Sequence, residues 1–374
     1  MIPLVLASGA LPLPPIIGGE DSAPSREAVV HVHAFVDGHA ANCAGTAVTP
    51  RTVITARHCI VGLGAPFATC TGATFRDAST ADLPSIIVST GADSGSPSAE
   101  RAVVSVLAPD EPEVCGHDFV VLVLDLALPV TPLPVRLDRR NTAGELVTVA
   151  GWGWTDTTPL PDIRQERMHV PILEVADAAK SWVVPDELVF GESICDGDSG
   201  GPLLSEDSGA LIGVASRNHH DDAQQVLPPG SCEGDSVRNV AESTRVMLDV
   251  LLRATAEASE ELTPEAAPAG ATLEAGAACA SDHDCLSGLC VDDVQGSRCS
   301  RLCSEERPCG MGDQCTTAQS VGICMSAPAD PAMSGADGGC ALSRRPATGQ
   351  SALRALAVLA ALALVRRRRA VLAG

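Results

Sequence analysis

The sequence predicts an all-β fold followed by a small disulfide-rich module, on three observations. Between Ile16 and about Ala256 the chain is a succession of short apolar runs separated by Gly, Pro, Asp and Ser, the pattern of strands joined by turns. A single long stretch, Ser243–Ala254, repeats its apolar residues at helical spacing. Eight cysteines crowd into Cys279–Cys324. Many short strands and one closing helix are typical of a β-barrel or a β-sandwich.

Six apolar runs are the clearest strand candidates, because turn-forming residues bound them. In chain order they are Val29–Val36, Gly45–Ala56, Ile86–Thr90, Phe119–Leu124, Leu146–Ala150 and Ala210–Ala215. The helix candidate follows the last strand, and its apolar positions are Val246, Leu248, Val250, Leu251 and Leu252.

Shifts in composition divide the chain into segments. Residues 1–15 are apolar and proline-rich without a basic start, so we expect either a signal-peptide remnant with Ser8-Gly9-Ala10 as its cleavage site or a pro-segment. Two segments rich in small residues are expected linkers. The predicted order is the β domain (16–256), a linker (257–278), the disulfide-rich module (279–325), a second linker (326–339) and a tail (340–374).

Charge and cysteine count limit the partners and the compartment. The net charge of −22 argues against a nucleic-acid partner and favours solubility. The 15 cysteines fall into six in the β domain, eight in the module and Cys340 alone, which indicates disulfides and export to an oxidising compartment. Zinc is the rival explanation for the module, but it contains no C-x2-C pair. Its disulfide connectivity stays open.

The strongest motif is GDSGGP, Gly197–Pro202. A serine before two glycines can expose its hydroxyl on a tight turn beside backbone N–H groups, which is the geometry that acyl transfer needs. Ser199 is therefore the candidate nucleophile.

A serine nucleophile needs a base and a carboxylate that orients the base. His58 follows an apolar strand and precedes Cys59, and a disulfide to Cys43 would hold its loop. Asp118 opens a continuous apolar run, where a buried acid requires a partner such as an imidazole N–H. Asp125, at the end of the same run, is the rival carboxylate.

These segments resemble the trypsin/chymotrypsin family of serine endopeptidases over Ile16 to about Ala256. The matching motifs are Ile16–Gly19, Thr55–Cys59, the Asp118 strand with Leu126–Pro129 after it, Gly151–Gly153 and Gly197–Pro202. The resemblance implies two six-stranded β-barrels with a C-terminal helix. It also implies that Ser199, His58 and Asp118 are the catalytic triad, and that the N–H groups of Gly197 and Ser199 form the oxyanion hole.

The resemblance further implies that Asp198 pairs with the α-amino group of Ile16 once the chain is cut before that residue. Pro15 stands where the family usually has a basic residue, so activation by a trypsin-like enzyme is not expected. We expect the mature chain to start at Ile16.

Motif alignment puts Ser193 at the floor of the specificity pocket, where trypsin-like members have Asp. Serine offers no charge, so cleavage after large apolar residues is the default expectation. Ser216-Arg217-Asn218 matches the family's Ser-Trp-Gly wall only at Ser216, and Asn218 should narrow the entrance. The nearby cluster His219–Asp222 is either an acidic solvated loop or a metal site, and the first is preferred.

Cys195 and Cys232 match the family disulfide that braces this pocket, and Cys70 and Cys115 then remain to pair with each other. The tail contains Cys340, an apolar run of about 11 residues and Arg366–Arg369, and this run is shorter than the roughly 20 residues of a spanning helix. The tail resembles the C-terminal sorting tags of exported myxobacterial proteins, in which the cysteine marks a processing site. A plain tail anchor is the alternative.

The sequence therefore predicts a monomeric, exported serine endopeptidase without cofactor or metal. Its expected partners are protein or peptide substrates and an envelope sorting protease that acts on the tail, and its expected location is the cell surface. The alternative is a catalytically weak binding protein on a protease scaffold, with recognition by the module.

Overall fold

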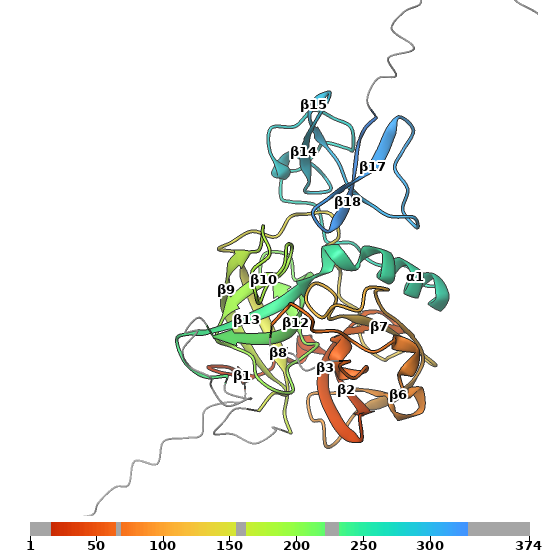
Figure 1. Ribbon diagram of the computed structural model, residues 1–374, viewed down its shortest axis with the longest axis vertical. Helices are drawn as coiled ribbons and strands as arrows, with labels where there is room; N and C mark the ends of the chain where they lie inside the picture. The colour runs from red at the N-terminus through yellow and green to blue at the C-terminus, as the bar shows by residue number, and fades with distance from the viewer. Residues whose placement is uncertain (1–15, 65–68, 155–161, 221–231, 328–374) are drawn as a thin grey trace, which may run out of the picture. The chain divides into compact units, whose positions relative to one another are not determined.

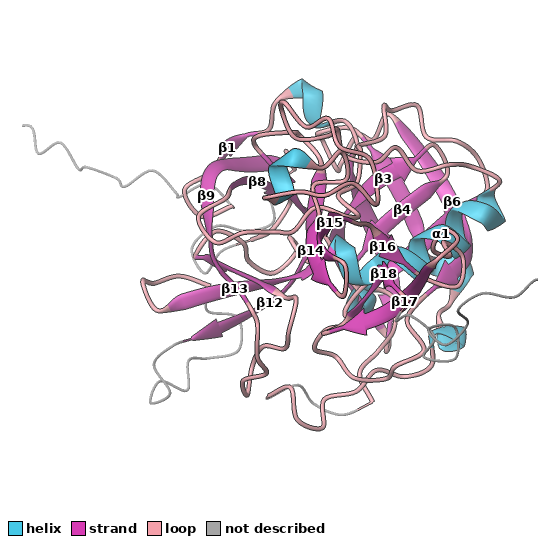
Figure 2. Ribbon diagram, turned by 90° about the horizontal axis from the view of Figure 1, so that it is seen from above, coloured by secondary structure: helices cyan, strands magenta, loops and turns pink. Residues whose placement is uncertain are grey.

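The computed structural model describes residues 16–64, 69–154, 162–220 and 232–327. Two predicted segments, residues 1–15 and the tail with Cys340, lie outside these ranges. Within the described residues the chain is mostly strand and loop, and α1 (Leu248–Ala258) is its one α-helix (Figure 2). Helices in this part of the chain are too short or too polar to cross a membrane.

The first barrel is a closed ring of six antiparallel strands (Figure 1). Around the ring they are β2 (Val29–Val36), β3 (His39–Thr49), β4 (Thr52–Thr55), β7 (Val120–Leu124), β6 (Ala99–Leu107) and β5 (Ile87–Thr90). Alternate valines of β2 and nearly every residue of β7 are buried, so the interior is filled by aliphatic side chains.

The second barrel also contains six strands and closes through the pairing of β8 with both β9 and β11. Its strands are β8 (Leu146–Gly151), β9 (Gln165–Val175), β10 (Leu188–Gly191), β13 (Val237–Ser243), β12 (Leu211–His220) and β11 (Pro202–Ser205), and the short β1 (Glu20–Asp21) pairs with β9. The predicted all-β fold with two six-stranded barrels is confirmed. Six short 3₁₀ helices connect the strands: Pro24–Arg26 (η1), Arg57–Cys59 (η2), Ala78–Thr80 (η3), Leu83–Ser85 (η4), Thr244–Met247 (η5) and Asp282–Asp284 (η6).

Two sequence expectations about the elements were wrong in detail. The run Gly45–Ala56 is not one strand, because the chain turns at Pro50 and Arg51 and Thr49 pairs with Thr52. Proline has no N–H to continue a ladder, which is consistent with a break there. The closing helix begins at Leu248 rather than Ser243, because Thr244–Met247 form the tighter turn η5.

Strand β9 was not expected at all, and its sequence explains why. Pro171 lies inside it, opposite Leu146, and a proline normally argues against a strand interior. His169 has a left-handed φ of 59°, and the register with β8 shifts in this region. The strand accommodates both irregularities as a bulge.

The C-terminal module consists of one hairpin and one three-stranded sheet. The hairpin pairs β14 (Cys290–Asp293) with β15 (Gly296–Cys299), and the sheet contains β16 (Leu302–Cys303), β18 (Val321–Ser326) and β17 (Asp313–Ala318). Four disulfides cross-link it: Cys279–Cys290, Cys285–Cys299, Cys303–Cys315 and Cys309–Cys324. Such a small unit depends on cross-links because its own core is small.

Apolar and ionic contacts join the module to the barrels. Leu302 and Ile323 belong to the same buried cluster as Leu251 of α1. The Asp138 carboxylate accepts hydrogen bonds from the Leu302 N–H at 2.8 Å and from the Arg307 guanidinium at 2.7 Å. The module is therefore anchored to the barrels by a shared hydrophobic core.

The segment after α1 is bound to the second barrel through a fully buried arginine. The Val135 N–H donates to the Thr263 carbonyl and the Glu265 N–H to the Val135 carbonyl. The Arg136 side chain, 0% exposed, donates to Glu265 at 2.6 and 2.7 Å and to Glu145 at 2.7 Å. This guanidinium connects the segment to the barrel by charge-assisted hydrogen bonds.

We expect Arg136→Met to lower the free energy of unfolding by about 3–5 kcal/mol, because the substitution leaves two largely buried carboxylates without their cation. Guanidinium unfolding followed by tryptophan fluorescence measures the change. Arg253→Met is the control, since Arg253 forms an exposed pair with Asp249 and should change stability by only about 0.5 kcal/mol or less. Similar losses in the two variants would contradict the assignment.

Candidate active site

His58 and Asp118 meet because their strands are paired. Strand β4 pairs with β7 so that Thr55 lies opposite Val120. The chain leaves β4 into η2, which contains His58, and it enters β7 just after Asp118. His58 Nδ1 is 2.8 Å from Asp118 Oδ2, and the His58 N–H donates to Oδ1 at 3.0 Å. The carboxylate thus orients both the ring and the backbone of the histidine.

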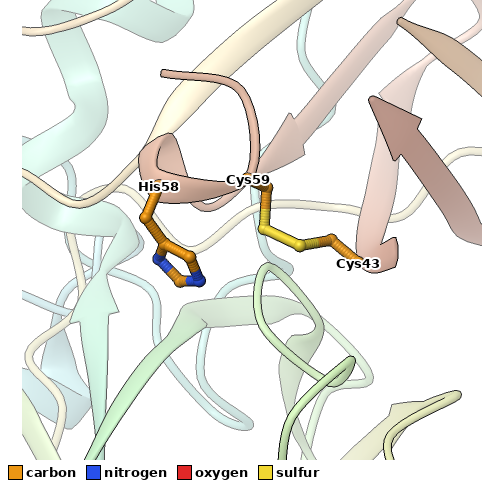
Figure 3. A group of neighbouring side chains, drawn as sticks. All are labelled: Cys43, His58 and Cys59. Atoms are coloured by element: carbon orange, nitrogen blue, oxygen red, sulfur yellow. A yellow bond between two sulfur atoms is a disulfide. The ribbon is translucent and has the colours of Figure 1, made fainter. Parts of the chain in front are cut away.

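A disulfide holds the histidine's short helix. Cys59, next to His58, is bonded to Cys43 of β3, and Figure 3 shows the imidazole and the disulfide leaving the same turn. Arg57, on the other side of His58, is buried and donates to the carbonyls of Pro109 and Glu111. Both neighbours of His58 in the chain are thus held in place, and they fix the position of the histidine.

The environment of the pair favours its charged form. Burial alone would raise the pKa of Asp118, but the nearby His58 and the hydrogen bonds from His58 and Ser216 lower it. Burial alone would lower the pKa of His58, but the charge and hydrogen bond of Asp118 raise it. The rival Asp125 is exposed, and its Oδ1 accepts from the N–H groups of Leu126 and Ala102. It therefore closes a turn away from His58.

Ser199 is half-buried beside the histidine loop. Its carbonyl accepts from the Ala44 N–H at 2.9 Å and lies 3.9 Å from Cys59 Sγ. Gly200, with φ of +80°, is so close to β4 that a Cβ there would lie 2.2 Å from Thr55 Oγ1. Only glycine fits this approach, which brings the serine next to the end of β4.

Gly197 has φ of +101° and packs against Gly153, so its turn also requires glycine. Asp198, directly before Ser199, is fully buried. Its carboxylate accepts from the Gly153 N–H at 2.7 Å and from the Cys195 N–H at 3.0 Å. Burial raises the pKa of Asp198 to about 7 in spite of these two hydrogen bonds.

Ile16 is also fully buried, in the cluster that contains Ile194, and the adjacent Ile17 N–H donates to the Ser193 carbonyl at 3.0 Å. The start of the described chain is therefore inserted beside the segment that leads to Asp198. Pro15 lies outside the described residues.

Two of the three predicted pocket residues, Ser193 and Asn218, are connected through a residue that the sequence did not single out. Asn239 of β13 is the Cα partner of Asn218 on β12, and its Nδ2 donates to Asn218 Oδ1 at 2.6 Å. Asn239 Oδ1 accepts from the backbone N–H groups of Ser193 and Ile194 at 2.9 and 3.2 Å. Ser216 instead faces Asp118, to which its hydroxyl donates at 2.6 Å.

Two buried glutamates near Asp118 were also missed. Glu187 and Glu242, 1% and 0% exposed, surround the Arg217 guanidinium. A charged residue inside an otherwise apolar run, as in Val240-Ala241-Glu242, was the available signal. An acid there is buried only if it finds a partner.

The remaining cysteines of the barrels are paired as Cys70–Cys115 and Cys195–Cys232. Three groups of Cys and His among the described residues are close enough to share an ion, but all their cysteines are in disulfides. They offer no thiolate ligands. In the cluster His219–Asp222, the His219 ring stacks on Trp182 with ring centroids 4.2 Å apart. Asp221 and Asp222 lie outside the described residues.

Comparison with known proteins agrees with this geometry. "Serine protease 1" of Drosophila melanogaster is 40% identical over 91 residues, which are 22% of this chain and 34% of that protein, so the chain spans about a third of its length. "Trypsin" of Saccharopolyspora erythraea is 28% identical over 213 residues, covering 54% of this chain and 86% of that protein. "Chymotrypsin-2" of Vespa crabro is 27% identical over 212 residues, with 54% and 88% covered.

Among solved structures, the scabies mite inactivated protease paralogue S-I1 matches with a TM-score of 0.47 and 16% identity, over 64% of this chain and 99% of that chain. The trypsin family profile matches residues 16–232. Since this match covers more than half of the chain and contains His58, Asp118 and Ser199, the chain belongs to the trypsin family.

Proposed function

We propose that this protein is a serine endopeptidase that cleaves peptide bonds through an acyl-enzyme on Ser199. The hydrogen-bonded His58–Asp118 pair beside the Ser199 turn is the observation that carries the proposal. Its substrates are proteins or peptides. The family membership supports this activity. The proposed cleavage chemistry depends on Ser199, His58, Asp118 and the turn that precedes the serine.

In the proposed reaction, His58 Nε2 takes the proton of the Ser199 hydroxyl as its oxygen attacks the scissile carbonyl. The resulting oxyanion accepts hydrogen bonds from the N–H groups of Gly197 and Ser199, each worth a few kcal/mol in such sites. His58 then gives its proton to the leaving amine. Water repeats the sequence on the acyl-enzyme and regenerates the serine. Throughout, Asp118 holds the ring and stabilises its cationic form.

We infer that cleavage before Ile16 switches the enzyme on. Asp198 is a buried carboxyl with two N–H donors and a raised pKa, so its ionised form is poorly stabilised in the uncut chain. A free α-amino group at Ile16, which is buried nearby, would supply the missing cation. The resulting ion pair would hold the turn between Gly197 and Ser199 in its active form.

The disulfides support export as part of the proposal. Seven disulfides occur within the described ranges, and such bonds persist in oxidising compartments. A secreted or surface-exposed protease meets these conditions.

The specificity pocket is proposed to accept a small side chain. Ser193 precedes the nucleophile, and Ser216 contacts its triad, so a substrate side chain next to the scissile bond would enter between these two segments. We propose that the hydrogen-bonded side chains of Asn218 and Asn239 extend into this space. This Asn218–Asn239 bridge favours alanine-sized residues over the large apolar residues expected by default from Ser193 alone.

The nucleophile test uses the full chain processed to begin at Ile16. Ser199→Ala should abolish labelling by a fluorophosphonate and lower peptide hydrolysis by roughly 10⁴-fold or more, because the acyl-enzyme cannot form. Ser96→Ala, at an exposed serine, should change neither. A parent protein that neither labels nor cleaves would favour the binding-protein alternative.

The activation proposal predicts a pH-dependent stability of the uncut chain. The pKa of Asp198 in the folded state, about 7, exceeds the ordinary 3.8, so its contribution is fully present below pH 3.8 and is lost as pH rises through 7. The loss is about 4 kcal/mol. Unfolding by denaturant between pH 4 and 8 should show a smaller decline in Asp198→Asn than in the parent, since only the parent loses the contribution of Asp198. Asp177→Asn, at an exposed position, should decline like the parent. Parallel curves for parent and Asp198→Asn would contradict the assignment.

The pocket proposal predicts the order of cleavage of peptides that differ only in the residue before the scissile bond. Alanine should be preferred to phenylalanine by roughly 10-fold or more in kcat/KM, and Asn218→Gly should reduce or reverse this preference by opening the space. Asn42→Gly, in the first barrel, is the control. If the parent cleaves strongly after phenylalanine, the Asn218–Asn239 bridge does not keep large side chains out of the pocket.

A further inference from the structure

A cluster of buried charges lies behind the carboxylate that orients His58. It contains the Arg217 guanidinium, whose side chain is 9% exposed, and the buried carboxyl groups of Asp118, Glu187 and Glu242. Arg217 belongs to β12, Glu242 to β13 and Glu187 precedes β10, so the second barrel provides three of the four members. Asp118 comes from the first barrel.

Arg217 is the centre of this cluster. Its Nη2 donates to Glu187 Oε2 at 2.6 Å and to the Trp182 carbonyl at 3.0 Å. Its Nη1 donates to the Ser216 hydroxyl at 3.2 Å and lies 3.7 Å from Glu242 Oε1. The Ser216 hydroxyl donates in turn to Asp118 Oδ2 at 2.6 Å. One hydroxyl group therefore separates the guanidinium from the carboxylate of the triad.

The two glutamates also hold the backbone that presents Asp118. The Gly116 N–H donates to both Glu187 Oε1 at 2.8 Å and Glu242 Oε1 at 3.1 Å, and the Asp118 N–H donates to Glu242 Oε1 at 3.3 Å. Without a cation, three carboxyl groups so close together could not all remain ionised. Arg217 compensates their charge while its rigid fork fixes their positions.

We propose that Arg217 is a positioning residue of the active site: through Ser216 and the two glutamates it holds the Asp118 carboxylate against His58 and sets the pH range in which His58 acts as a base. This inference rests on the proposed function. It assigns a role to a residue that stands where the matching motif of the family has tryptophan.

The charges in the cluster divide unequally. Burial and the neighbouring Glu187 raise the pKa of Glu242 well above its ordinary value, which favours the neutral form of Glu242. The short ion pair of Arg217 is the one with Glu187, at 2.6 Å. Burial alone would lower the pKa of Arg217, but the two glutamates raise it, so the guanidinium stays charged. Its positive charge opposes the effect of Asp118 on His58.

Two further charged groups face the pair and remain in every variant. Asp196, on the exposed turn before the nucleophile, raises the pKa of His58. Arg57, next to His58, interacts with Asp118 across the first barrel's loop. Because these two charges are the same in all variants, a shift of the acidic limb after substitution of Arg217 reports the loss of Arg217 itself.

The test measures kcat/KM as a function of pH for the full chain processed to begin at Ile16. The substrate is a peptide in which alanine is the residue immediately before the scissile bond. Arg217→Met should lower kcat/KM at least about 10-fold and move the acidic limb of the profile upward by about half a pH unit or more, because His58 loses a nearby positive charge. Arg217→Lys keeps the positive charge and loses the planar fork of the guanidinium. Its acidic limb should therefore lie close to that of the parent, while its kcat/KM should stay below that of the parent.

Two controls separate positioning from general destabilisation. Glu242→Gln should leave the acidic limb in place, because the raised pKa of Glu242 favours its neutral form and Gln is a neutral side chain of the same size. Arg136→Met removes a fully buried arginine elsewhere and should lower stability without moving the limb. An unchanged limb in Arg217→Met would overturn the proposal, and if that variant does not fold, an unshifted limb with fully restored rate in Arg217→Lys would also overturn it. A parent without labelling or cleavage would instead refute the proposed function.

Discussion

The structure depends on the burial of one carboxylate, that of Asp118. A charge removed from water must be matched by nearby donors and cations. Asp118 opens β7 in the first barrel, and its oxygens accept from His58 of the same barrel and from Ser216 of the second. The two barrels thus contribute to one set of hydrogen bonds, and their relative position is constrained where the chemistry would occur.

The same requirement explains the other buried polar groups. Glu187 pairs with Arg217, Oε1 of Glu242 accepts from backbone N–H groups, and Arg136 pairs with Glu145 and Glu265. Asp198 has no such cation among the described residues, and its pKa is raised because its two N–H donors do not fully compensate for its burial. A buried acid of this kind is suited to a switch, since a cation that arrives later changes its state.

Local sequence could predict the candidate triad residues and seven of the barrel strands, namely β2, β3, β4, β5, β7, β8 and β12. GDSGGP, the cysteine beside His58 and the acid before an apolar run each carry their meaning within a few residues. Strand β9 could not be predicted, because Pro171 and the left-handed His169 violate local strand preferences and are tolerated only through pairing with β8. Asn239 was missed for a similar reason, since only the register of β12 and β13 puts it opposite Asn218.

The sequence by itself determined the fold class, the family and the identity of the candidate nucleophile, base and acid, because these follow from short motifs and from the alternation of apolar and turn residues. The tertiary structure decided which groups share the space around them. Arg217 meets Glu187 and Glu242, Asn239 donates to Asn218, and the segment after α1 binds Arg136. These contacts join residues far apart in the chain, and their partners are set by strand pairing and burial rather than by local sequence.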